Sequence, residues 1–182
     1  MKETGVVRKL DNLGRLVIPK EIRRCMRIKE GSPIEFGLLP SGEIVLCKYS
    51  LVNQISDYAD DFCEALGEIC DVIAMVSDRD KIIASYGISK KNTVGAKLSS
   101  EVLDILDSQA CYIASNKDGT TIVPIIEEDK STYLSQIIMP ISIQGEIEGS
   151  IILLDTRGDI ELSSEHILSL KLASKFLSKQ ME

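Results

Sequence analysis

The chain has 182 residues, of which 44 % are apolar and 27 % charged, a globular composition that excludes disordered and fibrous proteins. No apolar run approaches the roughly 18 residues that a membrane-spanning helix needs, and no apolar segment follows the first lysine as in a secretory signal. We therefore expect a cytoplasmic protein with no membrane partner. The five cysteines show no C-x-x-C spacing, which favours reduced core thiols over disulfides or a structural zinc site.

The net charge of −7 conceals two oppositely charged segments. Residues 1–48 contain ten basic and six acidic side chains, a net charge of +4, whereas the remaining residues carry a net charge of −11. Such an asymmetry indicates a nucleic-acid-binding part attached to a second part with another role.

The first fifty residues predict a small β-rich unit with one short helix. Pro19 favours an extended residue before it and suits the first turn of a helix, so we expect a helix from Lys20 to Arg27. A unit of this size buries little surface, and we expect a second copy of itself to complete it. The strands expected from alternation and turn residues span 6–10, 15–18, 34–38 and 43–49.

The rest of the chain predicts an α+β domain with a largely antiparallel sheet. An amphipathic helix over 51–69, with Ser50 as its N-cap, is expected to join the two halves. Further helices are expected over 97–106 and from about residue 163 onward. The expected strands span 72–76, 82–86, 121–126, 133–143 and 146–154.

The last helix has more apolar surface than a single contact can cover. We expect its own sheet on one side and, on the other, the 51–66 helix of a second subunit in a symmetric four-helix contact. The alternative is a helix fully enclosed within one domain. Its apolar residues are Ile167, Leu168, Leu170, Leu172, Ala173, Phe176, Leu177 and Met181.

The helix after Pro19 carries its positive charges on one face. The basic residues follow the i, i+3, i+4, i+7 spacing of a single helix face, and an apolar face with Ile22, Cys25 and Met26 lies opposite. Basic residues that precede the helix add to the same electropositive region. The set comprises Lys2, Arg8, Lys9, Arg15, Lys20, Arg23, Arg24 and Arg27.

This basic region favours duplex DNA as the partner. Arginine forms forked hydrogen bonds with phosphates and with guanine edges. Phe36 and Tyr49 are the only aromatic residues in this part of the sequence, so stacking on single-stranded bases is not expected. The competing interpretation is an ordinary solvated helix face on an acidic protein.

The run from Gly5 to Arg24, GVVRKLDNLGRLVIPKEIRR, resembles the N-terminal domain of the AbrB-like transition-state regulators. The resemblance implies an intertwined swapped-hairpin dimer over residues 1–50, in which Arg8, Arg15, Arg23 and Arg24 contact DNA. At its full length the chain resembles the sporulation-stage regulators of this family. For residues 51–182 this implies a GAF-like antiparallel-sheet domain with flanking helices, which assembles two dimers into a homotetramer.

No pattern in the sequence points to catalysis. Asp78 and Asp80 flank Arg79 in a turn, and His166 stands near a helix start without a metal-ligand partner, so turn and capping roles are expected. Because no nucleophile is accompanied by a base and an orienting group, we expect neither an enzyme nor a bound metal or cofactor. The polar loop 89–93 between Gly87 and Gly95 has two interpretations, the border of a small-molecule pocket or an ordinary loop.

The sequence therefore predicts a DNA-binding transcriptional regulator, and the resemblance implies that it acts on sporulation-stage genes, whether as activator or repressor. Its acidic domain is expected to oligomerise, and ligand sensing by that domain stays open. Two alternatives are an antitoxin-type autoregulator and a signalling module that binds a ligand but not DNA.

Overall fold

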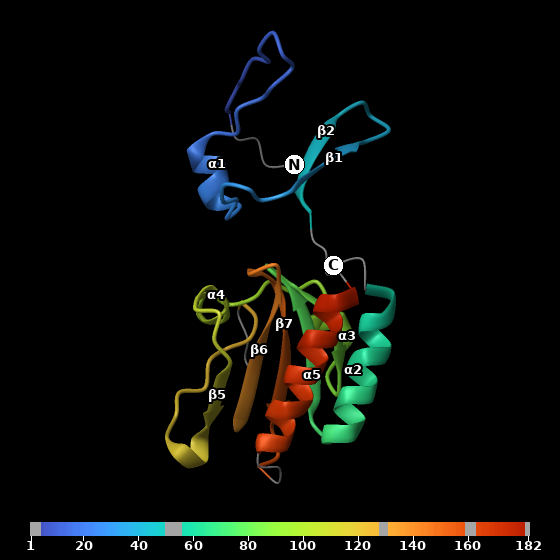
Figure 1. Cartoon of the computed structure of the whole chain (residues 1–182), viewed down its shortest axis with the longest axis vertical. Helices are drawn as coiled ribbons and strands as arrows, with labels where there is room; N and C mark the ends of the chain where they lie inside the picture. The colour runs from blue at the N-terminus through green and yellow to red at the C-terminus, as the bar shows by residue number, and fades with distance from the viewer. Residues whose placement is uncertain (1–4, 50–55, 128–130, 159–162, 181–182) are drawn as a thin grey trace. The chain divides into compact units, whose positions relative to one another are not determined.

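The computed structural model of the chain describes residues 5–49, 56–127, 131–158 and 163–180. It divides into two compact units, Met1–Tyr49 and Ser50–Glu182 (Figure 1). Each unit is described by itself below. None of the helices in these ranges is long and apolar enough to cross a bilayer.

The N-terminal unit contains one helix and one two-stranded antiparallel sheet. The helix, α1, spans Lys20–Cys25, and the sheet pairs β1, Ile34–Leu38, with β2, Ile44–Lys48. Phe36 lies opposite Leu46 and Leu38 opposite Ile44, so one face of this hairpin is apolar. These elements confirm the two strands expected over 34–38 and 43–49.

The strands expected over 6–10 and 15–18 are not formed in the single chain. The segment instead runs as extended backbone around a turn, in which Asp11 N donates to Arg15 O and Gly14 N donates to Asp11 O. Val7 and Val17 are exposed on this segment, so no packed surface holds the two arms as a ladder.

Helix α1 ends two residues earlier than expected. Arg27 adopts a left-handed φ of 52°, and this turn lets Arg27 N donate to Arg24 O and Ile28 N donate to Arg23 O. This is the Schellman arrangement that satisfies the last helical carbonyls. Arg27 therefore lies past the helix and does not extend the basic face by another turn.

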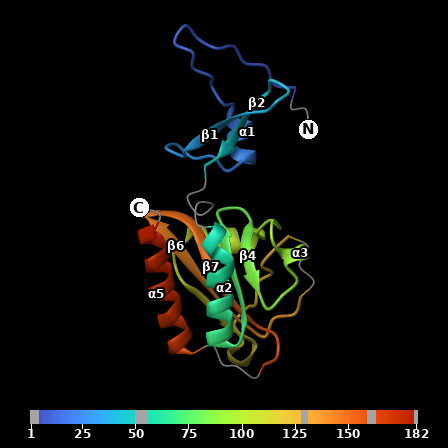
Figure 2. The same ribbon diagram turned by 90° about the vertical axis from the view of Figure 1, so that its right-hand side faces the viewer.

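The C-terminal unit is built on a five-stranded antiparallel sheet with the order β4-β3-β7-β6-β5. Two long helices, α2 and α5, cover one face side by side (Figures 1 and 2). The strands are β3 Ile73–Asp78, β4 Ile82–Tyr86, β5 Tyr112–Ser115, β6 Ser135–Ile143 and β7 Glu146–Asp155. The helices are α2 Ser56–Cys70, α3 Lys90–Thr93, α4 Ser100–Asp107 and α5 Ser164–Gln180, with a 3₁₀ turn, η2, at Asn116–Asp118.

The sheet separates two apolar cores. Along β7, Ile151 and Leu153 face α2 and α5, whereas Ile152 and Leu154 face α4 and the loops beyond it. All four side chains are completely buried, which explains why this strand is apolar at consecutive positions rather than at alternate ones. The predicted α+β class with an antiparallel sheet is confirmed.

The main departure in this unit concerns the segment 121–126, which was expected to be a strand. Only an isolated bridge from Leu98 to Ile126 forms there, because Pro124 cannot donate to a ladder. Side chains hold the segment instead: Ser99 Oγ donates to Pro124 O over 2.6 Å and Tyr112 OH donates to Thr121 O over 2.6 Å. Strand β6 pairs with β7 on one side and with β5 on the other. The sequence analysis missed β5.

Helix α2 lies very close to β4 at Gly67. A Cβ added at this glycine would stand 2.2 Å from Cδ1 of Tyr86, so the Tyr86 ring occupies the space that any other side chain would need. Ser50 and residues 51–55, where the N-cap and the first turn of this helix were expected, lie outside the described residues.

Candidate nucleic-acid interface

The basic residues predicted to bind DNA are all exposed where the structure describes them. Lys2 lies outside the described residues. The exposed residues are Arg8, Lys9, Arg15, Lys20, Arg23, Arg24 and Arg27. They come from the extended segment before Pro19, from α1 and from the turn after it, so the N-terminal unit presents a concentrated positive charge.

A tight turn organises the arm that carries Arg15. The Asp11 carboxylate accepts hydrogen bonds from Leu13 N at 2.9 Å and Arg15 N at 2.8 Å, and it pairs with Arg15 Nε at 2.6 Å. Gly14 supports the turn with a φ of 75°. The bonds from the Arg15 backbone and side chain hold the pKa of Asp11 below its ordinary value. The sequence analysis did not foresee this pairing, although the D-x-x-x-R spacing across a turn was a signal for it.

Helix α1 presents Lys20, Arg23 and Arg24 to solvent. Pro19 is its N-cap residue and the one buried residue in the described part of this unit, so it fixes the base of the helix while the cations face outward. The expected apolar back is incomplete, since Ile22 is half-buried but Cys25 and Met26 are exposed. The unit has no interior of its own against which these two side chains could pack.

Exposed apolar side chains surround the basic residues. Val7 is 82 % exposed, Leu38 is 79 % exposed, and the apolar face of the β1–β2 hairpin is open to solvent. The full set is Val6, Val7, Leu10, Leu13, Leu16, Val17, Met26, Phe36, Leu38, Leu39 and Ile44. So much apolar surface on so small a unit is typical of a protein–protein interface.

A second exposed apolar surface lies on the two long helices of the C-terminal unit. Leu168, Leu172 and Phe176 form a stripe at every fourth position of α5, opposite the side on which Leu170 and Leu177 are buried against the sheet. On α2, Tyr58 and Ile69 are likewise exposed. We name these five exposed residues, Tyr58, Ile69, Leu168, Leu172 and Phe176, the helix-pair surface.

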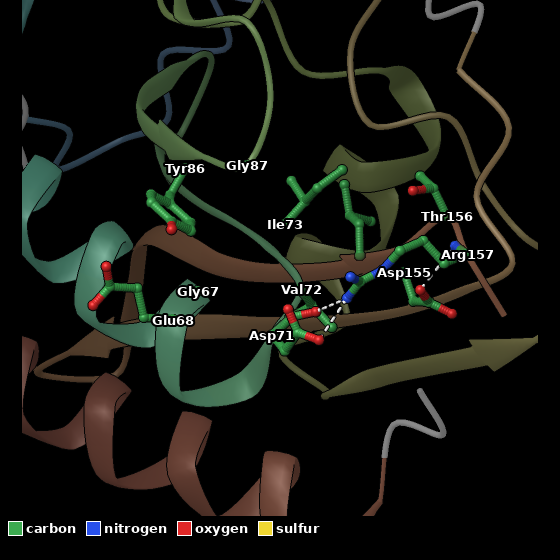
Figure 3. A pocket seen from close by; sticks show the side chains of 11 residues that line it. Gly67, Glu68, Asp71, Val72, Ile73, Tyr86, Gly87, Asp155, Thr156 and Arg157 are labelled. Atoms are coloured by element: carbon green, nitrogen blue, oxygen red, sulfur yellow. Dashed lines mark hydrogen bonds and ion pairs between the residues drawn. The ribbon is translucent and has the colours of Figure 1, made fainter. Parts of the chain in front are cut away.

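An open pocket of about 260 Å³ lies at one end of the sheet, where α2, β3, β4 and β7 meet (Figure 3). Arg157 reaches across it to Asp71, donating to the Asp71 carbonyl and pairing with its carboxylate at 2.9 Å. Gly87 borders this pocket, but Gly95 and the loop 89–93 do not. Residues 90–93 form α3, and Lys90 pairs with Asp60 at 2.8 Å.

The remaining polar candidates have structural roles. Asp78 Oδ1 accepts from the backbone N–H groups of Asp80 and Lys81, which confirms turn chemistry. His166 Nδ1 accepts from Ser163 N at the start of α5, the capping role expected for it. No group of three or more metal-ligating side chains gathers within the ranges that the structure describes.

Two buried ionisable groups support the C-terminal fold. Burial raises the pKa of Cys63 to about 12, so this thiol is a core side chain rather than a reactive one. Glu148 is buried and pairs with Arg79 across the end of β3 and β7. Burial raises the pKa of Glu148, although the neighbouring guanidinium opposes the effect.

Comparison with known proteins identifies relatives of both units. Residues 54–182 match the family described as "Stage V sporulation protein T C-terminal, transcription factor", and residues 7–53 match the family described as "Antidote-toxin recognition MazE, bacterial antitoxin". The chain is 35 % identical over 185 residues to stage V sporulation protein T of Bacillus subtilis (strain 168), covering 100 % of this chain and 99 % of the relative. The chain belongs to the stage V sporulation protein T family.

Each half of the stage V sporulation protein T architecture has relatives of its own. The transition state regulatory protein AbrB of Bacillus subtilis (strain 168) is 39 % identical over 71 residues, covering 39 % of this chain and 65 % of AbrB. The GAF domain of an Acinetobacter phosphoenolpyruvate-protein phosphotransferase superposes with a TM-score of 0.59 at 14 % identity, covering 74 % of this chain and 83 % of that one. The AbrB-like and GAF-like resemblances are thus confirmed, the second at the level of fold.

Proposed function

We propose that this chain is a DNA-binding transcriptional regulator that contacts duplex DNA through the basic residues of its N-terminal unit. The observation that carries the proposal is the set of exposed cations on α1 and on the arm before it, within a protein whose net charge is −7. Membership of a family described as transcription factors supports it. Residues 1–50 would form the DNA-binding domain and residues 51–182 the oligomerisation and sensing domain, without catalytic chemistry.

The DNA-binding form is a dimer of the N-terminal unit. Two arguments support this step, the exposed apolar side chains that a single copy cannot bury and the small footprint of one set of cations. A two-fold axis would cover the apolar faces and double the basic surface, which suits a duplex whose backbone is itself locally two-fold symmetric. The resemblance to the AbrB-like regulators supports the same arrangement.

The C-terminal units join two such dimers into a tetramer through the helix-pair surface. Its apolar residues are flanked by charges of opposite sign on the two helices, which favours α5 of one copy against α2 of another. The exposed cations on α5 are Lys171, Lys175 and Lys179, and the exposed carboxylates on α2 include Asp61, Glu64 and Glu68, whereas Asp60 pairs with Lys90 of the same chain. A second copy would therefore complement this surface in charge and cover its apolar residues.

Salt-dependent DNA binding tests the first part of the proposal. Arg23→Ala should weaken binding of the full chain to duplex DNA and lower the log–log salt slope by about two, because a dimer loses about two phosphate contacts. Lys117→Ala is the control, since it removes one exposed cation from η2 in the acidic unit. Equal affinity and slope for both variants would contradict the DNA interface.

Sedimentation tests the tetramer. Leu172→Asp places a charge in the centre of the helix-pair surface and should leave dimers, because the N-terminal contact remains. Val94→Asp makes the same chemical change at another exposed position, 40 % exposed, outside that surface. Tetramers of the Leu172→Asp variant would contradict the assignment of this surface.

The antitoxin alternative has one supporting observation, the match of residues 7–53 to the MazE antitoxin model. Antitoxins of this kind usually end in a flexible toxin-binding tail, whereas a folded unit with two cores follows residue 55 in this chain.

Failure of the chain to bind either random or promoter duplexes at low salt would favour instead a signalling module that does not bind DNA.

A further inference from the structure

We propose that Asp11 is a positioning residue that holds the guanidinium of Arg15 ready for DNA. The inference rests on the proposed DNA contact by Arg15 and goes beyond it, because it assigns a role in binding to an acidic side chain. On charge alone, a carboxylate beside a DNA-binding arginine should only oppose the phosphate backbone.

The geometry fixes the Asp11 carboxylate before it meets Arg15. Its Oδ1 accepts from two backbone N–H groups, those of Leu13 and Arg15, at 2.9 and 2.8 Å. Its Oδ2 then accepts from Arg15 Nε at 2.6 Å. An acceptor anchored to the backbone in this way sets the direction of the arginine side chain instead of following it.

The same contact leaves the useful end of the guanidinium open. Asp11 engages Nε, while Nη1 and Nη2 have no partner within the described residues, and the Arg15 side chain is 71 % exposed. Nη1 and Nη2 can bind two phosphate oxygens, or O6 and N7 of guanine, in a forked manner. Asp11 thus takes the one nitrogen that such a fork does not need.

The ion pair adds little to the stability of the fold. Asp11 and Arg15 lie on an exposed turn, with side-chain exposures of 37 % and 71 %, and exposed pairs of this kind stabilise a protein only weakly. Its effect is expected in the ordering of Arg15, since an arginine already held in its bound direction loses less rotamer freedom on binding.

Asp11→Asn separates positioning from charge. The asparagine Oδ1 can still accept from the Leu13 and Arg15 N–H groups, so the turn is kept. Its Nδ2 would face Arg15 Nε, and two donors cannot bond, so the guanidinium is released. Charge alone predicts tighter DNA binding by this variant because a negative charge is removed, whereas positioning predicts weaker binding.

The experiment measures binding of the full chain to labelled mixed-sequence duplex DNA by fluorescence anisotropy. The variants are Asp11→Asn, Arg15→Ala and the double variant, with Glu30→Gln as the control that removes one exposed negative charge from the same unit. We expect Asp11→Asn to bind about five- to tenfold more weakly, Glu30→Gln to bind equally or more tightly, and Asp11→Asn to have no further effect in the Arg15→Ala background. Thermal unfolding midpoints should be unchanged.

A spectroscopic signature distinguishes positioning from a purely structural role. The ¹Hε–¹⁵Nε resonance of Arg15 should move to the position of a free arginine in Asp11→Asn, while the backbone amides of α1 keep their shifts. Equal or tighter DNA binding by Asp11→Asn, with Arg15→Ala still weakened, would overturn the inference and leave the proposed function intact. Unweakened binding by Arg15→Ala would overturn both the inference and the assignment of Arg15 as a DNA contact.

Discussion

The two units of this protein use apolar residues in opposite ways. In the C-terminal unit, apolar side chains fill both faces of the sheet, and every buried hydrophobic residue in the described ranges belongs to this unit. In the N-terminal unit, large apolar side chains are exposed, and Pro19 alone is buried. The C-terminal unit therefore has a core of its own, whereas the N-terminal unit has the exposed apolar surface that the proposed dimer would cover.

The apolar patterns of the two units therefore carry different information about the fold. The C-terminal pattern describes a fold whose core one chain can form, whereas the N-terminal pattern suits the dimer proposed above. The same substitution should therefore have effects of different size and different concentration dependence in the two units.

The largest effect is expected in the closed core. Leu153→Ala removes a completely buried side chain of β7 from the core under α2 and α5, and we expect the free energy of unfolding of the C-terminal unit to fall by about 2–5 kcal/mol. Urea denaturation followed by circular dichroism measures the loss, which should not depend on protein concentration. A loss below about 1 kcal/mol would contradict the close packing of this core and, with it, the difference between the two units.

The matching change in the N-terminal unit is Leu38→Ala. In a single chain, truncation of a side chain that is 79 % exposed should change stability by no more than about 0.5 kcal/mol. If a second copy covers the β1–β2 hairpin, the loss should be about 1–3 kcal/mol and grow on dilution. Hydrogen exchange of the hairpin amides at several protein concentrations distinguishes an uncovered hairpin from one covered by a second copy. We expect the larger, concentration-dependent loss of a covered hairpin.

A smaller effect is expected at the end of α1. Arg27→Gly relieves the left-handed backbone at this position and should stabilise the N-terminal unit by about 0.5 kcal/mol. Arg27→Ala is the matched control, because it removes the same charge but keeps the strain. If both variants weaken DNA binding equally while only the glycine variant gains stability, the electrostatic and conformational roles of Arg27 are separate.

The smallest effect concerns pH and Glu148. Because burial raises the pKa of Glu148 in the folded state above the ordinary value of 4.5, the folded state retains this proton to higher pH than the unfolded state does. Its contribution to stability is therefore greatest below pH 4.5 and decreases as the pH rises through the folded-state pKa. Glu148→Gln should remove this decrease, which urea titrations at a series of pH values would reveal.

Glu101 provides a control of opposite sign for the Glu148 experiment. Hydrogen bonds from its own backbone N–H and from Ser100 lower the pKa of Glu101, so its contribution is present at neutral pH and lost as the pH falls. Glu101→Gln should therefore change the pH dependence in the opposite direction. The same direction in both variants would contradict the assigned role of burial at Glu148.

The sequence predicted best the elements whose pattern is local. The strand 82–86, the α5 start near residue 163 and the two strands expected over 133–143 and 146–154 follow from alternation, spacing and turn residues. The sequence predicts a strand over 121–126 because this segment is rich in β-branched residues, yet the structure forms none there. The contacts that hold it come from Ser99 and Tyr112, and their distance along the chain makes them invisible to a local pattern.

The candidate DNA site was predicted as a set of residues but not as a geometry. The resemblance to the AbrB-like regulators implied Arg8, Arg15, Arg23 and Arg24, and the helical spacing added Lys20 and Arg27. The end of α1 before Arg27 depends on a backbone conformation that the spacing argument did not consider. The pairing of Asp11 with Arg15 was also missed, because an acidic residue in a basic region is usually counted only as charge.

The contact between Gly67 and Tyr86 sets how closely α2 packs on β4. Because the ring of Tyr86 lies against the helix backbone with no room for a Cβ between them, helix and strand cannot slide past each other without a clash. A side chain at position 67 would have to push α2 away from β4 or displace the Tyr86 ring.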